Sequence, residues 1–119
     1  MKKTLVLGAT PNPERYAYQA TQRLLAKGHE VVLVGIKSGQ IAGIDIHTQT
    51  TIHPNIDTIT LYVGSERQQE WYDYILQTNP ARIIFNPGTE NPELVNKAQA
   101  QGIETLYACT LVMLASNQY

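Results

Sequence analysis

The residues best suited to chemistry in this chain lie together near its first residue, in a stretch that reads Gly-Ala-Thr-Pro-Asn-Pro-Glu-Arg. Gly8 and the small Ala9 allow a ligand to approach the backbone closely, and Thr10 and Asn12 can donate or accept hydrogen bonds. A helix that begins here points its free N–H groups and the positive end of its dipole toward the same place. Arg15, on the first turn, can form a bidentate contact with a phosphate. This arrangement predicts a pyrophosphate site.

The same stretch also supports a simpler interpretation. Pro13 lacks a backbone N–H, and Glu14 adds a negative charge beside the candidate site. Gly8 and Ala9 could then serve only as a tight turn between a strand and a helix, with Arg15 in solvent. The dinucleotide-binding fingerprint Gly-x-Gly-x-x-Gly is absent, so the stretch alone leaves both interpretations open.

A second cation follows the next apolar run, residues 31–34. The chain continues Gly-Ile-Lys, without an acidic residue in the position that holds the ribose diol of NAD. Lys37 in that position would instead favour a ribose that carries a phosphate, as in NADP and coenzyme A. The alternative is an ordinary surface lysine. The presence of both Arg15 and Lys37 favours the binding interpretation, because both side chains could then contact one polyphosphate ligand.

Short apolar runs and turn residues predict the elements that position these side chains. Five runs have the length and composition of buried strands: 4–7, 31–34, 58–63, 82–85 and 103–107. Start signals precede three predicted helices: Asn12-Pro13, Ser65 with Gln68, and Asn91-Pro92. Residues 110–114 predict a last, short helix. The segment 35–57 is too long for a plain connection, and it predicts a minor strand or a functional loop.

Strands that alternate with helices from end to end predict an α/β fold, with a five-stranded, mostly parallel sheet between two layers of helices. This three-layer, Rossmann-like arrangement would form a single domain over residues 1–119. Ligands of such folds bind outside the carboxyl ends of the strands, where the strand order reverses. The loops to which this rule points follow Leu7, Val34, Val63, Phe85 and Tyr107.

Composition narrows the classes of partner. The 119 residues carry a net charge of −1, without a run of Lys or Arg that could follow a nucleic acid backbone. The longest apolar stretches are far shorter than the ~20 residues that a membrane span requires. Cys109 is the single cysteine, which excludes an internal disulfide and favours a reducing compartment. We therefore expect a cytoplasmic protein that binds neither nucleic acid nor a membrane.

Several of these motifs together resemble the small CoA-binding-domain proteins. The matching segments are Gly8-Ala9-Thr10-x-Asn12-Pro13-x-Arg15 with Tyr18, Gly28-His29-x-Val31-Val32, Ile56-Asp57-Thr58, Phe85 through Asn91, and Ala108-Cys109-Thr110. The likeness extends from Lys3 to Tyr119, and the turn from Asn86 to Asn91 is its most specific part. These proteins share the Rossmann-like fold of the N-terminal domain of the succinyl-CoA synthetase alpha subunit, in which CoA lies across the carboxyl edge of the sheet.

By position, the resemblance implies three groups of contacts with coenzyme A. The residues near the diphosphate are Gly8, Ala9, Thr10, Asn12, Pro13 and Arg15. The residues near the adenosine are Val34, Gly35 and Lys37. The residues along the rest of the cofactor are Tyr62, Val63, Pro87, Gly88 and Cys109. The first loop lacks the second glycine of the synthetase pattern, and the synthetase's catalytic histidine belongs to a second domain, so the resemblance implies no synthetase activity.

No set of side chains predicts catalysis. Of the three histidines, His29 enters the second predicted strand, where a packing or hydrogen-bonding role is expected. His47 and His53 lack a nearby cysteine or paired carboxylates at metal-ligand spacing, so we expect no metal site. Cys109 lies just past the fifth predicted strand, at the sheet edge where the ligand should bind. It is either a small buried side chain or a thiol near that of the CoA pantetheine arm, able to form a reversible mixed disulfide with it.

Three hypotheses for the function follow. The first is a module that binds coenzyme A or an acyl-CoA without catalysis and acts as a carrier, sensor or regulator. The second is an NADP-dependent oxidoreductase, which Lys37 supports. The third is an interaction protein with a vestigial nucleotide cleft, which could form a homodimer through Trp71, Tyr72 and Tyr74. The alternative for these aromatic residues is that Trp71 and Tyr72 pack on the sheet and Tyr74 is partly exposed.

Overall fold

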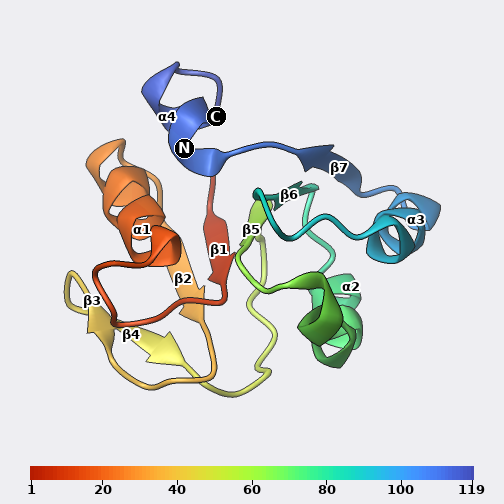
Figure 1. Ribbon diagram of the computed structural model, residues 1–119, viewed down its shortest axis with the longest axis horizontal. Coiled ribbons are helices and arrows are strands. Elements are labelled where there is room, and N and C mark those ends of the chain that lie inside the picture. The colour runs from red at the N-terminus through yellow and green to blue at the C-terminus, as the bar shows by residue number, and fades with distance from the viewer.

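Short apolar strands form one central sheet in the computed structural model, which describes residues 1–119 (Figure 1). The sheet has seven strands in the order β3-β4-β2-β1-β5-β6-β7. The strands are β1 (Thr4–Leu7), β2 (Val31–Val34), β3 (Gln40–Ile41), β4 (Ile44–His47), β5 (Thr58–Leu61), β6 (Arg82–Phe85) and β7 (Glu104–Tyr107). The helices are α1 (Tyr16–Ala26), the 3₁₀-helix η1 (Ser65–Trp71), α2 (Tyr72–Thr78), α3 (Pro92–Ala100) and α4 (Thr110–Ala115). All neighbouring strands are parallel except β3 and β4.

Five parallel strands end at the same level and create one continuous carboxyl edge. Leu7, the last residue of β1, pairs with Val34 of β2 and with Leu61 of β5. Leu61 pairs in turn with Phe85 of β6, and Phe85 pairs with Tyr107 of β7. The loops that follow these strands therefore leave the sheet side by side. The strand order reverses at β1 and β5, so their loops diverge and leave room for a ligand.

The sheet has two strands more than the five predicted from the sequence. Both lie in the segment 35–57, which predicts a minor strand or a functional loop. β3 and β4 form an antiparallel hairpin, and its two turn residues, Ala42 and Gly43, have positive φ angles of 51° and 80°. Turns of this kind match the twist of paired strands. β4 also pairs with β2 through Ile46 and Leu33, so the hairpin extends the sheet on that side.

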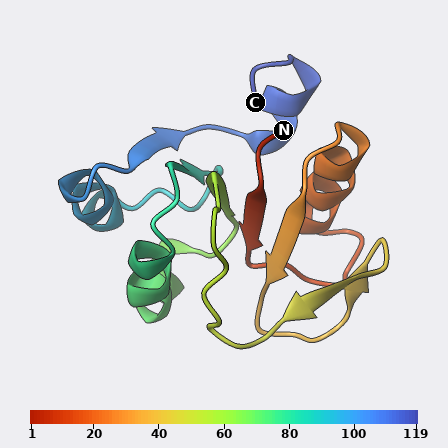
Figure 2. The same cartoon turned by 180° about the vertical axis from the view of Figure 1, so that it is seen from behind.

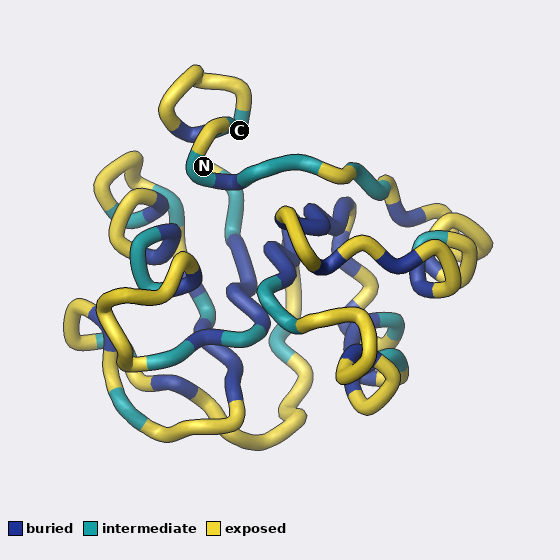
Figure 3. The backbone as a smooth tube through the Cα atoms, in the orientation of Figure 1, coloured by how far each residue is buried: buried dark blue, intermediate teal, exposed yellow.

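Helices cover both faces of the sheet, as the alternating pattern predicts. The core on the face of α1 and α4 includes Val6, Ala17, Leu24, Leu33 and Leu114. The core on the face of α2 and α3 includes Leu5, Ile59, Ile75, Phe85 and Leu94. Figures 1 and 2 show α1 on one side of the central strands and α2 and α3 on the other, and Figure 3 shows those strands as deeply buried. None of the helices has both the length and the apolar character needed to cross a membrane.

The helix-start signal predicted from the sequence is confirmed for α3 and is wrong for η1. Asn91 caps α3, with its Oδ1 accepting the N–H of Leu94 at 3.2 Å, and Pro92 follows at the start of the helix. Ser65 and Gln68 do not form the predicted capping box, because η1 has no side-chain cap and Gln68 is fully buried. The chain forms a 3₁₀-helix here, and α2 begins only after it.

α1 begins later than the sequence predicts. Asn12 is not its N-cap, because its Oδ1 accepts the N–H of Glu14 at 3.0 Å in a local turn. The N–H of Arg15 donates to the carbonyl of Asn12 at 3.2 Å, and the helix begins with the next residue, Tyr16. The later start places Tyr16 and Ala17 at the amino end of the helix.

The aromatic residues around the start of α2 belong to the fold. Trp71 and Tyr74 lie in the core, with their ring centroids 5.9 Å apart, and the Tyr74 hydroxyl donates to the carbonyl of Thr51 at 2.9 Å. Tyr72 is half-buried against the same core. The expectation of a partly exposed Tyr74 is therefore wrong, because Tyr74 and Ile75 together face the sheet.

Candidate functional site

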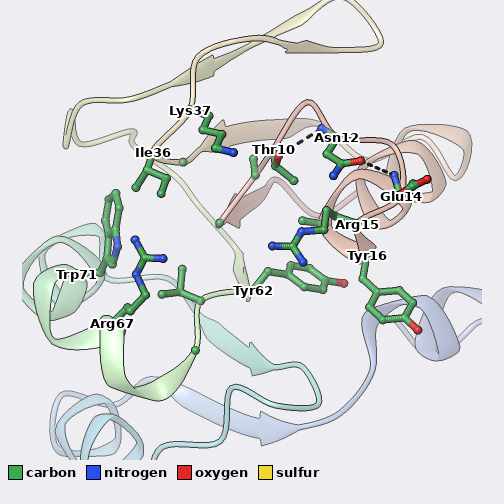
Figure 4. A pocket seen from close by; sticks show the side chains of 16 residues that line it. Thr10, Asn12, Glu14, Arg15, Tyr16, Ile36, Lys37, Tyr62, Arg67 and Trp71 are labelled. Carbon is green, nitrogen blue, oxygen red and sulfur yellow. Dashed lines mark hydrogen bonds between the residues drawn. The ribbon is translucent and has the colours of Figure 1, made fainter.

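A pocket opens at the carboxyl ends of β1, β2 and β5, beside the point where the strand order reverses (Figure 4). It encloses about 540 Å³, a volume typical of small-molecule sites. Its lining comes from three parts of the chain: the opening segment 8–17, the end of β2 at 35–37, and the segment 62–71 after β5. The structure brings together these residues predicted from the sequence: Gly8, Ala9, Thr10, Asn12, Arg15, Gly35, Lys37, Tyr62 and Val63.

Two glycines bring the opening segment close to the neighbouring strand ends. Gly8 has a φ of 98°, and a Cβ there would lie 2.8 Å from the carbonyl oxygen of Tyr62. A Cβ on Gly35 would lie 2.2 Å from the carbonyl oxygen of Ala9. The N–H groups of Gly8 and Ala9 donate to the carbonyl of Val34, at 2.9 and 3.0 Å. These two amides therefore hold the segment in place and are not free for a ligand.

Several other backbone amides of the lining have no acceptor within the chain. Among them are the N–H groups of Thr10, which precedes α1, and of Tyr16 and Ala17, which form its first turn. The N–H groups of Asn12 and Glu14, by contrast, donate to the side chains of Thr10 (3.3 Å) and Asn12 (3.0 Å). Unpaired amides at the amino end of a helix, with the positive end of its dipole behind them, attract an anion.

Three cationic side chains enter the pocket from three different segments. In Figure 4, Lys37 extends into it from the top of the view, Arg67 from the lower left and Arg15 from the right. None of them belongs to the one ion pair of the chain. Glu14 is the single carboxylate of the lining, and its side chain points away from the three cations in Figure 4. The pocket therefore favours a ligand with several negative charges.

Tyr62 follows β5 and extends beside Arg15 in Figure 4. Burial raises the pKa of its hydroxyl to about 12. The hydroxyl therefore stays protonated at neutral pH and adds no negative charge to the cationic pocket.

Five of the predicted residues do not line the pocket: Pro13, Val34, Pro87, Gly88 and Cys109. Val34 is fully buried and contributes the carbonyl that holds the opening segment. Pro13 is exposed in that segment, and Pro87 and Gly88 are exposed in the turn after β6. Cys109 is a half-buried free thiol at the N-cap of α4.

The turn after β6, from Asn86 to Asn91, is bonded to the rest of the fold. Asn86 is 2% exposed, and its amide nitrogen donates to Thr60 Oγ1 (2.8 Å) and to the carbonyl of Leu61 (2.9 Å). Its amide oxygen accepts the N–H of Thr110 at 2.9 Å. The hydroxyls of Thr60 and Thr110 are themselves hydrogen-bonded at 2.8 Å. Asn86 thus joins the ends of β5 and β6 to the start of α4.

A second buried amide joins the same turn to η1. Gln68 Nε2 donates to the carbonyls of Val63 (2.7 Å) and Thr89 (2.8 Å). Asn91 Nδ2 donates to Gln68 Oε1 at 2.9 Å. These bonds fix η1, and with it the backbone of Arg67, relative to the end of β5.

The lining also includes residues that were not among the sequence-based site residues: Glu14, Tyr16, Ala17, Ile36, Gly64, Arg67 and Trp71. The sequence does not predict Tyr16 and Ala17 as lining residues, because the Asn-Pro signal indicates an earlier helix start. It does not predict Arg67 and Trp71, because apolar spacing assigns the segment after the third strand to the core. The switch-point rule does point to that segment, so its one arginine could be found by searching each such loop for cations.

The profile of the family described as "CoA binding domain" matches residues 2–115 of the chain. No curated protein sequence matches it. The crystal structure of an uncharacterized protein, 48% identical in sequence, superposes with a TM-score of 0.98 over 100% of this chain and 98% of the other. A hypothetical protein from Pyrococcus horikoshii OT3 is 24% identical and superposes with a TM-score of 0.87, over 98% of this chain and 83% of the other.

A larger protein contains the same fold as one part of its chain. The dinucleotide forming acetyl-coenzyme A synthetase 1 from Ca. Korarchaeum cryptofilum is 18% identical and superposes with a TM-score of 0.75. The match covers 90% of this chain and 26% of the synthetase. At this level of identity the likeness concerns the fold alone.

Proposed function

The chain belongs to the CoA-binding domain family, and on that premise we propose that it binds coenzyme A or an acyl-CoA in the pocket at the ends of β1, β2 and β5. The observation that carries the proposal is the convergence of three unpaired cations from three segments, Arg15, Lys37 and Arg67, on one pocket. Coenzyme A brings a diphosphate and a ribose phosphate to its adenosine end. The bound protein would act as a carrier, sensor or regulatory module, without catalysis of its own.

The free amides of the opening segment suggest where the diphosphate binds. The N–H groups of Thr10, Tyr16 and Ala17 are unpaired, and Arg15 extends into the pocket beside them. A diphosphate at this place would gain charge-assisted hydrogen bonds and the favourable field of the helix dipole. Lys37 would then contact the ribose phosphate, with the adenosine near the end of β2.

A cytoplasmic setting goes with this proposal. Cys109 is a free thiol, and reducing compartments keep thiols in that state. Coenzyme A and its thioesters would then reach the pocket directly.

An NADP-dependent oxidoreductase is the second candidate, because NADP also carries a ribose phosphate that Lys37 could contact. The pocket lining holds a single carboxylate, Glu14, which points away from the pocket in Figure 4, so the lining favours NADP over NAD. An interaction protein with a vestigial cleft is the third candidate. The unpaired cations weigh against it, because a disused site has no reason to keep like charges close together.

Binding measurements with coenzyme A, dephospho-CoA, NADP and NAD separate the three candidates. Coenzyme A at one hundred times its Kd should stabilise the protein by about 2.7 kcal/mol and raise its Tm by several degrees. A Tm shift with NADP but not with coenzyme A would establish the second candidate instead. No shift with any of the four compounds would leave the third.

A pair of variants tests the site as well as the ligand. Arg15→Gln removes a pocket cation, so it should weaken coenzyme A binding by about tenfold, measured by isothermal titration calorimetry. Arg23→Gln is the matched control, because Arg23 is exposed on α1 and does not line the pocket. Equal affinities of the two variants would refute the proposed position of the phosphates.

A further inference from the structure

The two halves of the carboxyl edge differ in what they offer a ligand. Every residue that lines the pocket comes from the segments after β1, β2 and β5. No residue from the loops after β6 and β7 takes part. The pocket therefore occupies one half of the edge, around the strand-order reversal, and ends before the turn at Asn86.

The turn after β6 also uses its own polar groups internally. The N–H of Gly88 donates to Glu90 Oε1 at 3.0 Å. The N–H and the hydroxyl of Thr89 both donate to the carbonyl of Asn86, at 2.9 and 2.8 Å. Asn86 and Asn91 have their side-chain amides bonded inside the fold. An arm with amide and hydroxyl groups, such as pantetheine, would compete with these bonds rather than fill vacant ones.

The three cations of the pocket, in contrast, match the charge of the nucleotide end of a coenzyme A molecule. Its negative charges lie on the ribose phosphate and the diphosphate, whereas the pantetheine arm and the thiol are uncharged at neutral pH. Arg67 lies across the pocket from Arg15, and Lys37 extends toward both from the top of the view (Figure 4). Its backbone is fixed by the buried amide of Gln68, which bonds to Val63 and Thr89.

We propose that this pocket recognises the phosphorylated adenosine end that all CoA thioesters share and makes no contact with the acyl group, with Arg67 as a further cation that binds the phosphates. The inference rests on the proposed function. It assigns to the protein a ligand class, CoA and its thioesters irrespective of acyl group, rather than one acyl-CoA. The pantetheine arm would leave the pocket along the surface.

Calorimetric titrations with five compounds test the inference: coenzyme A, acetyl-CoA, butyryl-CoA, adenosine 3′,5′-bisphosphate and pantetheine. The first three should bind with Kd values that agree within about threefold, because a difference of one tenfold step would need an acyl contact worth a hydrogen bond. The bisphosphate should bind and compete with coenzyme A, whereas pantetheine should not compete. Arg67→Gln should weaken coenzyme A and acetyl-CoA by the same factor, about tenfold, and Arg23→Gln should weaken neither.

The outcomes separate this inference from the function on which it rests. If coenzyme A does not bind, the proposed function fails and the inference falls with it. If coenzyme A binds but one thioester binds more than tenfold tighter, or the bisphosphate does not compete, only the inference is overturned. A mixed disulfide on Cys109, formed when its thiolate displaces one CoA thiol from CoA disulfide and detected by intact mass, would also overturn it. Such an adduct would place the end of the arm at α4.

Discussion

Two segments of this molecule leave the same edge of the sheet with nearly the same residue types and do different things. The opening segment after β1 and the turn after β6 each combine asparagine, threonine, proline, glycine and glutamate. Asn12 is exposed, and the amides around it at Thr10 and Tyr16 have no acceptor in the chain. Asn86 and Asn91 are buried, and their side chains bond to four other parts of the fold. The two segments differ in where their hydrogen bonds go: those of the turn bond within the fold, whereas the opening segment keeps donors free for a ligand.

This difference indicates that the motif from Asn86 to Asn91 has a structural role. It is the most specific part of the family resemblance, yet its side chains hold strands and helices together. The opening segment matches its family pattern less well, and it offers the free donors and a cation. We therefore expect changes in the turn to reduce stability, and changes around the opening segment to reduce binding.

The largest expected effect is on stability, from Asn86→Ala. The substitution removes two donated bonds and leaves the buried N–H of Thr110 without an acceptor. Unsatisfied buried groups are costly, so we expect a loss of about 3 kcal/mol and a Tm lower by roughly 10 °C. Chemical and thermal unfolding measure the loss, and the exposed Asn96→Ala on α3 is the matched control.

Binding by the same variant tests the comparison directly. Measured well below its Tm, the Asn86→Ala protein should bind coenzyme A within about twofold of the original affinity. A variant with unchanged stability and lost binding would show that the turn is a ligand surface, and the contrast between the two segments would disappear.

Gly35→Ala should reduce both stability and coenzyme A binding, because Gly35 lines the pocket and packs against the backbone of the opening segment. A Cβ at this position would be 2.2 Å from the carbonyl oxygen of Ala9, and backbone cannot yield as a flexible side chain does. We expect a loss of about 2 kcal/mol in stability, together with weaker coenzyme A binding as the opening segment is displaced. Gly64→Ala is the stability control, because a Cβ on Gly64 meets nothing within 4 Å. Equal Tm values for the two variants would contradict the close approach.

Lys37→Gln should act on binding alone and on one ligand more than another. The side chain is exposed at the end of β2, so its loss should leave the Tm within about 2 °C of the original value. Coenzyme A should bind about tenfold more weakly, whereas dephospho-CoA, which lacks the ribose phosphate, should bind as before. Calorimetry with both ligands checks this, and an equal loss for both would remove Lys37 from the ribose phosphate.

The fold could be predicted from the sequence because its signals are local and repeated. Thr4–Leu7, Val31–Val34 and Arg82–Phe85 are strands with the predicted bounds, since a strand buried on both faces needs a continuous apolar run. The hairpin at Ala42-Gly43 has short, half-exposed strands, and such strands leave little apolar pattern. That is why the predicted sheet lacked two strands.

The site could be predicted only where position alone determines it. Arg15 and Lys37 lie in the segments that follow β1 and β2, at the amino end of the first helix and just after the second strand, so the switch-point rule places them at the pocket. Arg67 depends on the path of η1, which the buried Gln68 determines through bonds to Val63 and Thr89. Side-chain bonds between distant segments leave no periodic signal in a sequence, and those bonds decide which polar residues are free.

The smallest expected effect is the response of stability to acid, which neither segment should control because neither contains a histidine. Burial lowers the pKa of His53, whose Nε2 has no hydrogen-bond partner, and His47 beside it adds to the shift. A histidine with a lowered pKa in the folded state binds fewer protons than in the unfolded chain, so stability is retained above a pH of about 6.5 and falls as the pH drops below it. Urea unfolding at a series of pH values should show this decline, less steep in His53→Gln and parallel to the original in Asn86→Ala. A decline in Asn86→Ala as shallow as that in His53→Gln would mean that the turn also carries part of the acid response, and its role would then extend beyond holding the strands together.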